Sequence, residues 1–328
     1  MKHHLIRLFL ASAIILAAAA AVAADDPGVI FSVSGEQKAL ADLGVKFTEP
    51  GNAAEGYLPY LNGTAPSMKA TWFQALNLGN AIDPKDEEQK KAQAAALAAA
   101  GPDLDALIAA SRKQDYVMWG TLVKPDPKLT PFSMQTLNFL DLTRLACLLV
   151  GDAKIRAAKG DPSAEERLLA AVRIGHHCEQ DVESFTLIWG ALIRVKAANA
   201  LSELYEKQGK KDLAEAWKKY AASMETRRKA GIDTIKAFPN WTEAQLKAFI
   251  LNQENPTSMR LEALIVGRYC LHSKEDALKC RLTGQPAWVK AVRQEVKFSD
   301  PQAQAILPLL DNAMTTKELT MMDFNVPQ

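Results

Sequence analysis

Apolar residues recur with helical spacing along much of the second half of the chain. The clearest run begins after Phe132, where apolar residues fall on one helical stripe and charged residues lie mostly away from it. This spacing predicts one long amphipathic helix. Gly160, Asp161 and Pro162 follow the run and end the predicted helix. The apolar stripe consists of Leu137, Leu140, Leu145, Leu148 and Ile155.

Three more helices are predicted directly after this one. Ser163 is a suitable N-cap for the first of them. The second runs from about Ser184 to Gly209, and the third runs from Asp212 to Ala230. We expect the second helix to bury a stripe with 3-4-3 spacing, made of Phe185, Ile188, Leu192 and Val195.

Short turns at Gly160 and Gly209 would fold these four helices into two antiparallel hairpins. The two glycines are 49 residues apart, whereas tetratricopeptide units repeat about every 34 residues. The sequence therefore predicts an all-α fold built as an irregular array of antiparallel helical hairpins. The second hairpin resembles a tetratricopeptide unit in the relative spacing of Leu201, Tyr205, Gly209, Ala214 and Ala221.

The two ends of the chain have weaker patterns. Residues 25 to 60 mix glycine, proline and short apolar pieces, which predicts a loosely structured N-terminal arm. A helix is expected from Asp83 to Ala100, a break at Gly101 and Pro102, and a second helix as far as Gln114. The expected division is a signal peptide at 1–24, an arm with short helices at 25–131, a helical-hairpin core at 132–230, and a C-terminal helical region at 231–328.

Several short motifs stand in an order that resembles a group of uncharacterised secreted bacterial α-helical proteins with tetratricopeptide-like hairpins. The resemblance covers roughly residues 52 to 271. It implies export and a helical fold, and it assigns no activity. The motifs are Asn52-Ala53-Ala54-Glu55-Gly56-Tyr57, Asp115 through Trp119-Gly120, Gly160-Asp161, and Ala170 through Arg173, Gly175 and His177.

The first 24 residues have the order of an export signal. Lys2 and Arg7 precede an apolar run from Leu8 to Ala21, and small residues end at Ala24. We expect cleavage after Ala24 and a periplasmic or secreted protein. Without the signal, 37 of the 39 basic residues remain against 38 acidic residues, which does not favour nucleic acid as a partner. Since no apolar run after Ala24 reaches the roughly 18 residues that a membrane span needs, none is expected there.

Four cysteines remain in a compartment that permits oxidation. Cys147 lies about as far before the turn at Gly160 as Cys178 lies after it. Equal distances would place the two thiols opposite each other across the hairpin, which predicts a Cys147–Cys178 disulfide; the alternative is two reduced core cysteines. Cys270 and Cys280 would form the second bridge by elimination.

His176, His177 and Cys178 are the most reactive-looking tripeptide, since imidazole and thiolate bind zinc and copper. Consecutive helical positions point about 100° apart, so one helix cannot direct all three at one metal. We therefore expect no metal site, with His176 and His177 as weak candidates. The interpretation that we favour is a partly buried His176 and a surface His177 paired with Asp181. No cofactor is expected.

The sequence contains no short motif of a known catalytic or nucleotide-binding site. Stacked helical hairpins present broad surfaces, so the expected role is a binding or scaffold component of the cell envelope whose partner is another envelope protein or a peptide. The alternative is a helical hydrolase that cleaves cell-wall or polysaccharide substrate through paired carboxylates, which need no local motif. A pocket with two facing acids would favour the enzyme. A broad aromatic and apolar groove would favour the binding protein.

Overall fold

The computed structural model of the protein describes residues 31–65, 77–131, 137–269, 286–296 and 298–313, and it is all-α, as the sequence predicts. A single two-stranded sheet accompanies the helices of these residues. The elements are α3 (Val33–Asp42), β1 (Glu49–Asn52), α4 (Ala54–Leu61), α6 (Leu78–Ile82), α7 (Glu87–Ser111), β2 (Lys113–Asp115), α8 (Phe139–Ala158), α9 (Ser163–Glu179), α10 (Ser184–Lys207), α11 (Lys211–Ala237), the 3₁₀ helix η2 (Phe238–Asn240), α12 (Glu243–Leu251), α13 (Thr257–Tyr269), α15 (Ala287–Glu295), α16 (Pro301–Ile306) and the 3₁₀ helix η3 (Leu307–Asp311).

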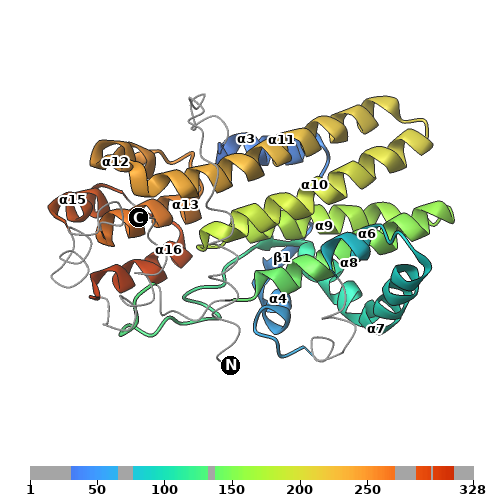
Figure 1. Cartoon of the computed structure of the whole chain (residues 1–328), viewed down its shortest axis with the longest axis horizontal. Helices are drawn as coiled ribbons and strands as arrows, with labels where there is room; N and C mark the ends of the chain where they lie inside the picture. The colour runs from blue at the N-terminus through green and yellow to red at the C-terminus, as the bar shows by residue number, and fades with distance from the viewer. Residues whose placement is uncertain (1–30, 66–76, 132–136, 270–285, 297, 314–328) are drawn as a thin grey trace.

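Helices α8, α9, α10 and α11 form the centre of the fold. Consecutive helices of this set pack against each other, and Figure 1 shows them stacked with their long axes side by side. Gly160 and Gly209 make the turns after α8 and α10 with φ of 72° and 76°, a region that glycine adopts without strain. The four helices predicted from the hydrophobic pattern are therefore present, and α11 continues seven residues past the expected end at Ala230.

The close crossing of α9 and α10 depends on two glycines. A Cβ at Gly175 would lie 2.6 Å from the carbonyl oxygen of Gly190, and one at Gly190 would lie 2.4 Å from the carbonyl oxygen of Gly175. Only a hydrogen at both positions allows the two backbones to approach this closely. The crossing brings the end of α9 next to Arg194 of α10.

The buried face of α10 differs from the prediction. Phe185, the first residue of the predicted stripe, is 49% exposed. Since α9 and α11 cover α10 from two directions, its buried residues extend around most of the helix instead of following one stripe. Leu187, Ile193 and Leu201 are fully buried.

The N-terminal segment is not the loose arm that the sequence predicts, at least from residue 31 onward. It forms α3, β1 and α4, and Phe31, Ala53 and Tyr57 are completely buried. Strand β1 pairs in parallel with β2, and the Asn52 side chain accepts a hydrogen bond from the backbone N–H of Val117 at 2.9 Å. The short apolar pieces of this segment show no periodicity in the sequence. They are ordered by contacts with residues that lie far away in the chain.

The predicted break at Gly101 and Pro102 is also wrong. Helix α7 runs unbroken from Glu87 to Ser111 with Pro102 inside it. The hydrogen bond that proline removes costs stability, while buried residues on both sides of it, including Ala96, Ala100, Leu104 and Leu107, hold the helix against its neighbours. Among the described residues, α7 is also the one helix long and apolar enough to cross a membrane by composition, a test that buried core helices pass as well.

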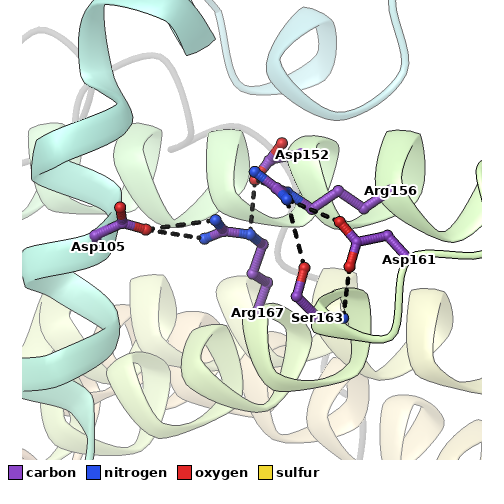
Figure 2. A network of polar contacts seen from close by, with 6 residues as sticks. All are labelled: Asp105, Asp152, Arg156, Asp161, Ser163 and Arg167. Atoms are coloured by element: carbon purple, nitrogen blue, oxygen red, sulfur yellow. Dashed lines mark hydrogen bonds and ion pairs between the residues drawn. The ribbon is translucent and has the colours of Figure 1, made fainter.

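A polar network fixes the turn between α8 and α9 (Figure 2). Arg167 of α9 lies 2.8 Å from Asp152 of α8 and 3.4 Å from Asp105 of α7, so one guanidinium joins three helices. Ser163 is not the N-cap of α9 as predicted. Instead, the Asp161 carboxylate accepts the Ser163 backbone N–H at 2.9 Å and pairs with Arg156.

The C-terminal helices α12, α13, α15 and α16 pack at one end of the central stack (Figure 1). Thr242 begins α12 with a capping box, in which Thr242 and Gln245 each satisfy a backbone N–H of the other. Helix α13 contacts α10. This contact places the start of α13 near the C-terminal end of α9, where the chain forms a pocket.

Candidate functional site

A pocket of about 300 Å³ opens at the C-terminal end of α9. Its walls come from segments far apart in the sequence: α3, the stretch around β2, α11, and the first residues of α13 and α16. We call it the α9 pocket. Its charged and imidazole side chains are Glu36, Asp115, His176, Glu179, Arg227 and Asp300.

The floor of the α9 pocket is an ionic network centred on Arg194. This arginine is fully buried, and its two terminal nitrogens donate to Glu36 of α3 and to Glu179 of α9. Tyr220 donates to Glu36 at 2.8 Å. Arg227 donates through Nε to the second oxygen of Glu179 at 3.1 Å. Four helices therefore meet through charge-assisted hydrogen bonds between largely buried side chains.

The network keeps its groups ionised in spite of their burial. Burial alone would raise the pKa of Glu36, but Arg194 and Arg227 outweigh it and hold that pKa below its usual value. Burial would likewise lower the pKa of Arg194, and the carboxylates of Glu179 and Glu36 raise it instead. Burial and the charge of Arg194 lower the pKa of His176 to about 4. At neutral pH the imidazole is uncharged beside an ionised network.

Gln302 is another residue that shapes the pocket lining. Its Oε1 accepts hydrogen bonds from the backbone N–H groups of Met118 at 2.7 Å and Trp119 at 3.1 Å, and its Nε2 donates to the Gln180 carbonyl at 2.9 Å. One buried amide thus joins α16, the segment after β2 and the end of α9. The Asp300 carboxylate accepts the Gln302 backbone N–H at 2.9 Å, and burial raises its pKa.

The first turn of α3 is anchored separately. The Glu254 carboxylate accepts hydrogen bonds from the hydroxyls of Ser32 and Ser34, both at 2.8 Å. An acid at the N-terminus of a helix also interacts favourably with the helix dipole. Together with the Glu36 contacts, this fixes α3 as one wall of the α9 pocket.

The two predicted histidine positions behave differently from each other. His176 is partly buried, as expected, and lines the pocket. The prediction of a surface His177 paired with Asp181 is wrong: His177 is fully buried, its Nδ1 lies 2.9 Å from the Tyr57 hydroxyl, and its ring stacks on Tyr116. Because residues 31–61 fold over this face of α9, a position that would be exposed on an isolated hairpin becomes core.

Asp181 is buried with different partners. It accepts hydrogen bonds from the Tyr116 hydroxyl at 2.8 Å and from the indole nitrogen of Trp119 at 3.1 Å. Burial raises its pKa to about 6. The aspartate therefore fixes the segment after β2, whose first residues line the pocket.

The predicted Cys147–Cys178 disulfide is absent. Both thiols are free and buried. Equal distance from a turn sets the height of a residue along a hairpin but not its direction around the helix. Cys178 lies at the α9–α10 crossing, where a side chain added at Gly190 would place its Cβ 3.3 Å from the Cβ of Cys178. Cys147 lies near Lys196, farther along α10. The second predicted pair, Cys270 and Cys280, falls outside the described residues, as does the predicted signal peptide.

Within the described parts of the chain, no group of three or more His, Cys, Asp and Glu side chains is arranged to hold a metal ion. His176 and His177 do not converge, since one ring lines the pocket and the other faces Tyr57. Of the charged and imidazole side chains that line the pocket, only His176 was singled out from the sequence. The available signal was an arginine, Arg194, inside the apolar stretch of α10, where an unpaired charge would be costly.

Comparisons of the chain with known protein families, with curated proteins and with solved structures find no match.

Proposed function

We propose that the protein is an exported binding component of the cell envelope and that it holds its ligand in the α9 pocket. The observation that carries this proposal is the pocket itself, a concave site of about 300 Å³ lined by polar groups from six separate segments. Ligand sites are usually preformed and concave, with a few fixed polar groups. The buried Arg194 network and the Gln302 contacts supply that rigidity.

A variant that fills the pocket tests this role. Val33 lines the pocket and is 36% exposed, so Val33→Trp should occupy the site without disturbing the core. Phe185→Trp, at an exposed position outside the pocket lining, is the matched control. Thermal unfolding would be followed with blocked amino acids, short peptides and cell-wall fragments. We expect ligands to stabilise the wild type and the control but not Val33→Trp, since only binding to the folded state raises the midpoint.

Stabilisation that survives in Val33→Trp would show that the ligand binds elsewhere. The export half of the proposal has its own measurement. N-terminal sequencing of the protein from the native envelope should begin at Asp25, and a sequence that begins at Met1 would contradict cleavage.

The hydrolase remains the second candidate because carboxylates do line the pocket. Glu36 and Glu179 are both hydrogen-bonded to Arg194. The lowered pKa of Glu36 makes this residue a poor proton donor. Asp300 and Asp115 are the better pair, since burial raises the pKa of Asp300 while Asp115 is exposed. A general acid needs a raised pKa, whereas its partner carboxylate has to be ionised. Cleavage of peptidoglycan or polysaccharide that is lost in both Asp300→Asn and Asp115→Asn would establish the enzyme.

A further inference from the structure

We propose that the α9 pocket selects a cationic group, an ammonium or guanidinium such as the side chain of a basic residue. This names the ligand class of the site proposed above and rests on that proposed function. The geometry is a pocket of about 300 Å³ with Glu36, Asp115, Glu179 and Asp300 around it. That volume is at the lower end of the roughly 300–1,000 Å³ of small-molecule sites, which suits one side chain or one small molecule.

The balance of charge in the pocket is negative. Four carboxylates stand against two guanidinium groups, Arg227 in the lining and Arg194 bonded to Glu36 and Glu179, which leaves a formal charge of −2. Burial raises the pKa of Asp300, and with Asp300 protonated the formal charge is still −1. His176 adds no positive charge because burial and Arg194 lower its pKa to about 4. A low-dielectric wall strengthens the attraction between such a site and a cation.

The individual carboxylates are not equally available. Glu36 and Glu179 share Arg194, and the positive charge of Arg227 is offset by its hydrogen bond to Glu179. Asp300 caps the short helix α16. Asp115 is an exposed residue of the pocket lining, and its segment is held by the pairing of β1 with β2. Asp115 is therefore the acid that we expect to contact the cation.

The helix ends at the pocket do not reverse this preference. Helix α9 ends there, with carbonyl groups that attract positive charge, and α13 begins there, with N–H groups that repel it. These two effects offset each other. The Asp300 carboxylate satisfies the N-terminus of α16. The sign of the net charge in the pocket is therefore set by its charged side chains.

The experiment is calorimetric titration of the full-length exported protein with four blocked amino acids. Acetyl-arginine amide and acetyl-lysine amide carry the cation. Acetyl-citrulline amide replaces the guanidinium by a neutral group of nearly the same shape, and acetyl-glutamate amide reverses the charge. A blocked Gly-Arg-Gly peptide separates a side chain within a chain from a free small molecule. Each titration is run at low salt and at high salt.

We expect both cationic probes to bind and the citrulline probe to bind at least about tenfold more weakly, since it lacks the charge–charge interaction. Asp115→Asn should weaken the cationic probes by a similar factor, and high salt should weaken them as well. Glu215→Gln is the control. It also removes one exposed acid, at a position about 18 Å along α11 from Arg227, and should change nothing.

Three results would overturn the proposal: equal binding of arginine and citrulline probes, preferred binding of the glutamate probe, or no binding of either cationic probe. The first two would leave the proposed binding function standing, provided that Val33→Trp abolishes the binding. Tighter binding of the Gly-Arg-Gly peptide than of acetyl-arginine amide would assign the site to a basic segment of a protein and would support the cation preference.

Discussion

Arg194 is the residue on which the pocket floor depends. Arg194→Met keeps most of the side-chain volume but leaves the Glu36 and Glu179 carboxylates buried without their guanidinium. Removing one partner of a buried ion pair costs about 3–5 kcal/mol, because the remaining charge is uncompensated. Urea unfolding should show that loss. Arg228→Met is the matched control on α11, where a partly exposed pair with Glu225 should contribute about 0–1 kcal/mol. Equal losses in the two variants would contradict the network.

The free thiols give a second expectation at the scale of single residues. Burial raises the pKa of Cys147 to about 12 and raises that of Cys178 as well. Since the thiolate is the reactive form, neither should react with a disulfide reagent near pH 8 while the protein is folded. Replacing Cys270 and Cys280 by serine isolates the two. Both thiols should then react fully with the reagent in denaturant. Peptide mapping that finds Cys147 disulfide-linked to Cys178 would contradict this expectation and support the bridge that the sequence predicts.

At the scale of elements, the α9–α10 crossing should tolerate no side chain at Gly190. Gly190→Ala would place a Cβ 2.4 Å from the Gly175 carbonyl oxygen and 2.8 Å from Cγ of Glu179. Overpacking of this kind costs about 1–3 kcal/mol or more. Glu215→Ala, at an exposed position of α11, is the control and should change the stability by no more than about 0.5 kcal/mol. The midpoint of thermal unfolding should therefore fall clearly in Gly190→Ala and stay close to the wild-type value in Glu215→Ala.

The elements themselves were predictable where the local signal was complete. The amphipathic stripe and Gly160 define α8, and Gly209 marks the turn between α10 and α11. Pro102 gave a strong local signal that tertiary packing overrides. The segment from residue 31 to 61 gave almost none, because its order comes from contacts such as Glu36 with Arg194, 158 residues away. Patterns along the chain reveal local periodicity, but they do not reveal which residues pair when they lie so far apart in the sequence.

At the scale of the whole molecule, the candidate site was hidden for the same reason. Apart from Arg194, its charged residues are ordinary in sequence, since an isolated charged residue on a helix is usually exposed. Their convergence needs the glycine crossing of α9 and α10, the return of α3 to the core, and the amide of Gln302. The adjacent residues His176, His177 and Cys178 drew attention because they are neighbours in sequence, yet only His176 lines the pocket.

The stability of the whole fold should fall as the pH rises from neutrality. Burial and the charge of Asp181 raise the pKa of Glu183 to about 8, whereas a glutamate in an unfolded chain titrates near about 4.3. The folded protein therefore keeps a proton that the unfolded chain releases, and stability is lost progressively between about pH 4 and pH 8. Raising the pH from about 7 to about 9 covers the last part of this loss, on the order of 1 kcal/mol.

Glu183→Gln isolates that contribution, because it keeps a neutral side chain of the same shape at the start of α10. Urea unfolding of wild type and variant at pH 7 and pH 9 should show the wild type losing more stability at the higher pH. The difference between the two proteins removes the contribution of the buried thiols, which act in the same direction. His176 and His177, whose pKa values burial lowers to about 4 and about 3, affect stability mainly below about pH 6.5 and so outside this window. Glu215→Gln should keep the wild-type dependence, and the same dependence in Glu183→Gln would mean that Glu183 is ionised in the folded protein.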